Sequence, residues 1–188
     1  MKIIFLDRDG VINKDPAGWT KHSYVTCPGD FHFLPGAKEA IKKLTDAGYE
    51  IIVLSNQAGI SRGYYNTEAL KAINEKMLKE ITASGGRIRS THYCHHKTDD
   101  GCNCRKPKTG LFEMATKAMK LDFNETFFIG DGSMDVEAGK KVGCKTILLL
   151  CGKSKLEDVK AWKYKPDYIK KDLSEAVDWL LEGEGKDA

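Results

Sequence analysis

The sequence predicts an α/β fold: a three-layer, Rossmann-like parallel sheet. Short apolar runs typical of buried strands alternate along the chain with segments whose apolar residues recur at helical spacing. The three strongest apolar runs also end in clusters of polar side chains. In an open parallel sheet the carboxyl ends of the strands share one edge, and ligands bind there. The sequence therefore predicts both a sheet and the edge that carries its site.

The length and composition favour a single globular domain over residues 1–188. A formal net charge of +3 is too small to indicate a nucleic-acid partner. The apolar run before Asp7 is too short for an export signal or a membrane span, so we expect a cytoplasmic protein without a membrane partner. In that compartment the six cysteines would stay reduced, which favours metal binding or packing over disulfides.

The first half of the chain contains two strong strand signals, each followed by a helix with apolar residues three and four apart. We expect Gly48 to end the first helix and Thr67 to cap the second. The expected elements are a strand over residues 2–6, a long loop over 14–35 with one short strand near 31–34, a helix over 35–47, a strand over 49–54 and a helix over 67–83.

The second half continues the alternation with shorter segments. The expected elements are a weaker strand over residues 87–93, a helix over 110–119, a strand over 126–129, a short helix over 136–142, a strand over 146–150, a charged mobile loop over 153–166, an edge strand over 167–169 and a helix over 174–181.

The polar clusters at the strand ends are rich in carboxylates. The strands are followed by Asp7 and Asp9, by Ser55 with Asn56, and by Asp131 with Asp135, while Arg105 and Lys106 precede the third strand. Clustered carboxylates suit Mg²⁺, which accepts waters and a substrate phosphate as further ligands. The metal would reduce the repulsion between the acids and an incoming phosphate dianion.

A second signal lies between residues 94 and 104, where Cys-x-His is followed closely by Cys-x-Cys. Three thiolates and one imidazole are enough for a closed tetrahedral Zn²⁺ site. We expect the ligands to be Cys94, His96, Cys102 and Cys104. Three alternatives stay open at this point: His92 or His95 as the imidazole ligand, a redox pair at Cys102 and Cys104, and cysteines that lie in this loop by chance.

A closed zinc site would be structural, because it has no open coordination position. It would staple a loop that otherwise lacks a core, and it would place Arg105 and Lys106, the next residues in the chain, beside the catalytic edge. The other cysteines are isolated and are expected to be packing residues: Cys27, Cys144 and Cys151.

The order of these segments resembles the four motifs of the haloacid dehalogenase superfamily of phosphohydrolases. The matching segments are Asp7-Arg8-Asp9-Gly10, Ser55-Asn56-Gln57, Arg105-Lys106-Pro107 and Gly130-Asp131 through Asp135. The resemblance implies that Asp7 is a nucleophile that forms an aspartyl phosphate and that Asp9 is the general acid and base.

The same resemblance implies further roles at the site. Ser55 and Lys106 would hold the transferring phosphoryl group. The Mg²⁺ ligands would be Asp7, the main-chain carbonyl of Asp9, and Asp131.

The zinc loop and the longer second motif, residues 55–63, narrow the resemblance to the heptose 1,7-bisphosphate phosphatases and the related histidinol-phosphate phosphatases, which carry no large cap domain. This implies a monomer that removes the 7-phosphate from D-glycero-D-manno-heptose 1,7-bisphosphate, a small sugar phosphate. The implied substrate-binding residues are Asp15, Gly18, Asn56, Gln57 and Arg105. The alternatives are histidinol phosphate as substrate, and a zinc-stapled binding module without catalysis.

Overall fold

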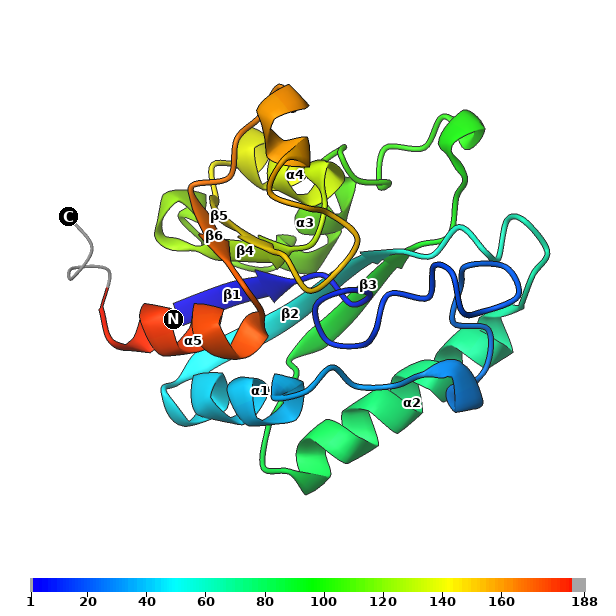
Figure 1. The fold of residues 1–188 in the computed structure, drawn as a ribbon, viewed down its shortest axis with the longest axis horizontal. Coiled ribbons are helices and arrows are strands. Elements are labelled where there is room, and N and C mark those ends of the chain that lie inside the picture. Colours follow the sequence, from blue (N-terminus) through cyan, green and yellow to red (C-terminus); the bar gives the residue numbers. More distant parts are fainter. Residues whose placement is uncertain (1, 184–188) are drawn as a thin grey trace.

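A six-stranded sheet forms the centre of the computed structural model, which describes residues 2–183 (Figure 1). The strand order is β3-β2-β1-β4-β5-β6, and all neighbouring strands are parallel. The strands are β1 (Lys2–Leu6), β2 (Tyr49–Asn56), β3 (Ser90–Cys94), β4 (Phe127–Gly130), β5 (Lys145–Leu149) and β6 (Tyr168–Lys170). The predicted parallel α/β architecture is therefore confirmed.

Helices cover both faces of this sheet and complete the three layers (Figure 1). One face carries α1 (Ala37–Asp46), α2 (Thr67–Ala83) and α5 (Leu173–Leu181), and the other carries α3 (Gly110–Thr116) and α4 (Ser133–Val142). Within residues 2–183, each α-helix contributes side chains to one of the cores against the sheet. No helix in this part of the chain is long and apolar enough to cross a lipid bilayer.

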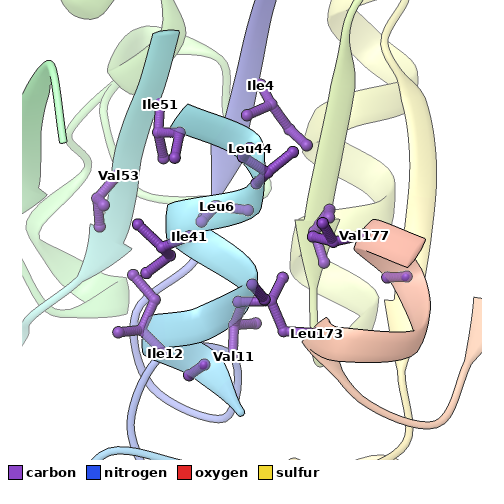
Figure 2. Close-up of a cluster of buried hydrophobic side chains, with 14 of the residues drawn as sticks. Ile4, Leu6, Val11, Ile12, Ile41, Leu44, Ile51, Val53, Leu173 and Val177 are labelled. Atoms are coloured by element: carbon purple, nitrogen blue, oxygen red, sulfur yellow. The ribbon is translucent and has the colours of Figure 1, made fainter. Parts of the chain in front are cut away.

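Strand β1 is buried on both faces, which explains its uninterrupted apolar sequence. Ile4 and Leu6 belong to the core beneath α1, and Phe5 belongs to the core on the opposite face. Figure 2 shows Ile41 and Leu44 of α1 packed over the strand residues of the first core. The fully buried strand holds the residues that follow Leu6 in a fixed position at the carboxyl edge.

Several element boundaries differ from the sequence-based expectation. Strand β3 begins at Ser90, three residues later than expected, and α3 ends at Thr116, three residues earlier than expected. The cap of α2 is Asn66, whose side chain accepts a hydrogen bond from the backbone N–H of Ala69 at 2.9 Å, so the assignment of Thr67 as cap is wrong. Helix α4 begins three residues earlier than expected, at Ser133. Residues 31–34 form one isolated bridge, between Asn13 and Phe33, in place of the expected short strand.

The segment over residues 153–166 is partly structured. It contains a 3₁₀ helix at Asp158–Ala161, and Val159 packs with Val136 and Leu148 in a third small core. This apolar anchor was hidden in the sequence because charged residues surround it.

Shortening a side chain of the core beneath α1 should destabilise the protein. Leu44→Ala removes a fully buried side chain, and we expect the free energy of unfolding to fall by about 2–5 kcal/mol. Urea denaturation monitored by circular dichroism measures this change. Glu39→Gln, at an exposed position of the same helix, is the control and should change stability by less than about 0.5 kcal/mol. An equal effect of the two substitutions would contradict the described packing.

Candidate active site

The polar clusters of the first, second and fourth strands line one cavity at the carboxyl edge of the sheet. The cavity lies beyond β1 and β4, which are neighbours in the sheet although they are far apart in the sequence. Its lining contains Asp7, Asp9, Asp15, Pro16, Ser23, Tyr24, Ser55, Asn56, Arg105, Lys106, Asp131, Met134, Asp135 and Lys153. This convergence is what the open parallel sheet predicts for its ligand site.

The ammonium group of Lys106 is the electrostatic centre of the cavity. The side chain is only 2% exposed, and its Nζ lies 3.0 Å from Asp7 Oδ1 and 2.7 Å from Asp135 Oδ1. Nζ also donates a hydrogen bond to the Leu54 carbonyl at 2.8 Å. All three N–H donors of the ammonium therefore have partners, which a buried cation requires.

This pairing keeps the two central groups charged. Burial alone would favour the neutral amine, but Asp135 and Asp7 raise the pKa of Lys106 above its usual value. Burial also opposes the charge of Asp7, and Lys106 and Lys153 together lower the pKa of that carboxyl below its usual value. Asp7 is therefore a carboxylate at neutral pH, the form that a nucleophile needs.

Three buried carboxylates can share a metal ion at this site. Asp7, Asp131 and Asp135 place oxygen atoms within 4.8 Å of one another. The Oδ1 atom of Asp131 is buried without a hydrogen-bond partner, and the Lys153 ammonium lies 3.5 Å from it. These hard oxygen donors, one of them without a hydrogen bond, fit Mg²⁺.

The close approach of the first and fourth motifs depends on Gly10. Its φ is +77°, and a Cβ atom there would lie 2.1 Å from Asp131 Oδ2. A larger residue would therefore push the Asp131 carboxylate away from Asp7, because neither the backbone nor the space tolerates a side chain.

The carboxylate of Asp9 lines the cavity and is paired with a buried arginine. The Arg8 guanidinium, which is 0% exposed, donates to both Asp9 oxygens from Nη2, at 2.9 and 3.0 Å. Asn13 and Gln57 donate further hydrogen bonds to Asp9 at 2.9 and 2.8 Å. Tyr65, whose pKa is raised by burial, donates its hydroxyl to Gln57 at 2.6 Å and so orients that amide. Asp9 is thereby fixed at the cavity wall.

The second motif supplies the Ser55 hydroxyl to the cavity wall and the Asn56 side chain that holds the backbone of Lys106. Ser55 lies in the cavity wall and accepts a hydrogen bond from Gln57 at 3.1 Å, which leaves its own proton free for a ligand. The Asn56 side chain accepts from the backbone N–H of Lys106 and donates to its carbonyl, both at 3.1 Å. Asn56 therefore fixes the backbone of Lys106 from two sides.

The cysteines and histidine expected to bind zinc lie together. Cys94, His96, Cys102 and Cys104 place one donor atom each within 4.8 Å of one another. The imidazole in this group is that of His96, with Nδ1 3.4 Å from the Cys104 sulfur, and not that of His92 or His95. Burial raises the pKa of Cys94 to about 12, so its thiolate would need a cation beside it.

Two expected substrate-binding residues have other positions. Among the described residues, Gly18 and Gln57 lie outside the cavity lining, and Gln57 is fully buried behind Asp9. Asp15, Asn56 and Arg105 line the cavity as expected.

Three residues that shape the site had no role assigned from the sequence. Asp135 pairs with Lys106, Arg8 pairs with Asp9, and Lys153 contacts Asp131. Asp135 was expected in the carboxylate cluster, and its place on the first turn of the helix after Asp131 is the signal for a more specific role. Lys153 carries no such signal, because it is one of several lysines in a charged segment.

The buried carboxylate of Asp131 should make stability depend on pH. Burial, with Asp135 and Asp7 nearby, raises its pKa to about 7 despite Lys153, whereas an unfolded aspartate titrates near ~3.9. Between about pH 4 and about pH 7, Asp131 is ionised in the unfolded chain but largely protonated in the folded protein. The free energy of unfolding therefore falls as the pH rises through this range. In the presence of a chelator, the free energy of unfolding of Asp131→Asn should rise relative to that of the wild type as the pH increases from about 4 to about 7. Above about pH 7 the difference between the two proteins should stay constant.

Urea unfolding of both proteins in EDTA, from pH 4.5 to 8, measures this difference. The matched control is Asp99→Asn, which removes the same kind of carboxylate from an exposed surface position. A difference between Asp131→Asn and the wild type that does not vary with pH would contradict the assignment.

Known proteins resemble the chain along most of its length. A HAD-hydrolase-like family model matches residues 103–176. The D-glycero-beta-D-manno-heptose-1,7-bisphosphate 7-phosphatase of Pseudomonas aeruginosa is 36% identical over 151 residues, which are 80% of this chain and 82% of the relative. The protein of the same name from Bordetella bronchiseptica is 32% identical over 182 residues, 97% of this chain and 99% of the relative.

Solved structures agree with the sequence relatives. The crystal structure of D,D-heptose 1,7-bisphosphate phosphatase from B. bronchiseptica, complexed with magnesium and phosphate, has a TM-score of 0.87 at 32% identity and covers 97% of this chain and 99% of its own. The enzyme of the same name from Burkholderia thailandensis has a TM-score of 0.72 at 30% identity, with 96% and 99% covered. The chain therefore belongs to the HAD-like phosphatase family that includes the D-glycero-D-manno-heptose-1,7-bisphosphate 7-phosphatases.

Proposed function

We propose that this phosphatase hydrolyses the 7-phosphate of D-glycero-D-manno-heptose 1,7-bisphosphate with the aid of Mg²⁺. The observation that carries the chemistry is the contact of Asp7 with Lys106, which holds a charged nucleophile at the carboxyl edge. The substrate rests on the relatives, which are named heptose bisphosphate phosphatases at 32–38% identity.

In this proposal the reaction has two steps. A carboxylate oxygen of Asp7 attacks phosphorus, the bond from phosphorus to the sugar oxygen breaks, and Asp9 donates a proton to that leaving oxygen. Water then attacks the phosphorus of the aspartyl phosphate, Asp9 takes up a proton of the water, the bond from phosphorus to the Asp7 oxygen breaks, and inorganic phosphate and the free Asp7 carboxylate result. The Ser55 hydroxyl donates a hydrogen bond to a phosphoryl oxygen, and the Lys106 ammonium, whose donors have protein partners, attracts the phosphoryl oxygens by its charge.

The residues for Mg²⁺ are the carboxylates of Asp7 and Asp131, with the main-chain carbonyl of Asp9 as the third ligand expected from the family resemblance. When bound, the metal would supply positive charge for the phosphoryl oxygens. The relative complexed with magnesium and phosphate supports this assignment, as does the unpaired Asp131 oxygen. Asp135 is close enough to join the metal group, but its ion pair with Lys106 favours a role in holding that lysine.

The second metal of the proposal is a structural Zn²⁺ held by Cys94, His96, Cys102 and Cys104. The tetrad comprises residues of two segments, and Lys106 follows two residues after its last member. A zinc ion there would fix residues 94–104 and, with the Asn56 clamp, the backbone of Lys106.

Replacing the nucleophile should abolish catalysis without unfolding the protein. Asp7→Asn cannot form the aspartyl phosphate, and we expect kcat on p-nitrophenyl phosphate with Mg²⁺ to fall by about 10³-fold or more, or roughly 4 kcal/mol of barrier. Thermal denaturation confirms that the variant is folded. Residual activity near that of the wild type would rule out Asp7 as the nucleophile.

The substrate assignment is tested by kcat/KM. The enzyme should prefer one heptose 1,7-bisphosphate anomer over histidinol phosphate and fructose 1,6-bisphosphate by about 10²-fold, which is roughly 2.7 kcal/mol of differential transition-state binding. A preference for histidinol phosphate would establish the alternative substrate.

Removing zinc should disturb the loop and the catalytic lysine together. After chelation under reducing conditions, we expect faster hydrogen exchange over residues 94–106 and lower activity even when Mg²⁺ is restored, because the tetrad no longer fixes the loop. Cys102→Ser should bind less zinc in metal analysis, whereas Cys27→Ser, an exposed cysteine outside the tetrad, should keep it. Full turnover by zinc-stripped protein would refute the structural role.

A further inference from the structure

Three cationic side chains line the cavity within the described part of the chain: Arg105, Lys106 and Lys153. Lys106 is buried and has a partner for each of its three donors, so it cannot follow a substrate. Lys153 differs from it in exposure, because 46% of its side chain is accessible. Its ammonium can therefore move where that of Lys106 cannot.

The path of the Lys153 side chain is set by two backbone features. Its own N–H donates to Asp131 Oδ2 at 2.9 Å, which anchors the residue beside the carboxylate. The side chain then passes over Gly132, where an added Cβ would lie 2.4 Å from Lys153 Cε and 2.9 Å from Nζ. Glycine at this position leaves the space that the lysine side chain occupies, so the ammonium reaches the cavity.

The Lys153 ammonium lies beside Asp131, which is a Mg²⁺ ligand in the proposed function. Nζ of Lys153 lies 3.5 Å from Asp131 Oδ1, the oxygen that has no hydrogen-bond partner. A divalent cation bound to that oxygen and the Lys153 ammonium would repel each other at this distance. The side chain is long, flexible and nearly half exposed, so its ammonium can leave the carboxylate without unfolding the loop.

We propose that Lys153 is a substrate-positioning residue that leaves Asp131 when Mg²⁺ binds and contacts the phosphate that is not transferred. This inference rests on the proposed bisphosphate substrate. The transferring phosphoryl group already has Lys106, Ser55 and the metal as partners. The second phosphate can contact the two partly exposed cations that line the cavity, Arg105 and Lys153. Lys153 therefore adds a second positive charge to that of Arg105.

The proposal predicts two effects of opposite sign in Lys153→Gln. Calorimetric titration with Mg²⁺ alone should give a severalfold lower Kd than for the wild type, because a competing cation is gone. The KM for the heptose bisphosphate should rise about tenfold with kcat within about twofold, while the KM for p-nitrophenyl phosphate stays within about twofold. Lys153→Arg, which keeps the charge, should restore the bisphosphate KM.

The matched control is Lys155→Gln, which removes the same charge from an exposed position that does not line the cavity. It should leave both measurements unchanged. An unchanged or higher Kd for Mg²⁺ in Lys153→Gln would overturn the competition, and an equal rise in KM on both substrates would place Lys153 on the transferred phosphate instead.

Failure of the proposed function gives a different result. If the wild type hydrolyses aryl phosphates but not the heptose bisphosphate, the substrate proposal fails, and the assignment of Lys153 to a second phosphate fails with it. The Mg²⁺ titration does not depend on the substrate and would still decide whether Lys153 and the metal compete for Asp131.

Discussion

The site depends on one buried ammonium group. Lys106 is held by carboxylates from the ends of β1 and α4 and by a carbonyl of β2, so it joins three elements of the fold at one point. Buried charges are costly unless they are paired, and removal of one partner of such a pair typically costs about 3–5 kcal/mol. The same contacts therefore position the reacting groups and stabilise the carboxyl edge of the sheet.

Two kinds of support fix this lysine. The sheet supplies a rigid frame, since β1 is buried on both faces and positions Asp7 directly after its last residue. The loop that carries Lys106 packs Cys102 and Cys104 against the core that contains Cys94. It is also held by the paired hydrogen bonds of Asn56, and the proposed zinc ion would add a further constraint two residues away. The loop is therefore held mainly by polar contacts, whereas packing on both faces holds the strand.

The order and type of most elements could be predicted because the strands are uninterrupted apolar runs and the helices have clear periodicity. The ends of the strands also indicated Asp7, Ser55 and Asp131, since parallel strands bring their carboxyl ends to one edge, whereas the role of Lys106 came from the family resemblance. The sequence did not reveal which side chains pair with which. The partnership of Arg8 with Asp9 depends on a guanidinium turned inward beside Tyr93, and local pattern contains no sign of that direction.

The strand order also determines when the site can exist during synthesis. Strand β1 pairs with β4, so Phe5 can pair with Phe128 only after more than a hundred further residues have been synthesised. A nascent polypeptide that ends before β4 contains Asp7, Asp9, Ser55 and Lys106 but lacks both Asp131 and Asp135. In such a shorter chain Lys106 can pair with Asp7 but not with Asp135, so the complete site requires the fourth strand and the helix that follows it.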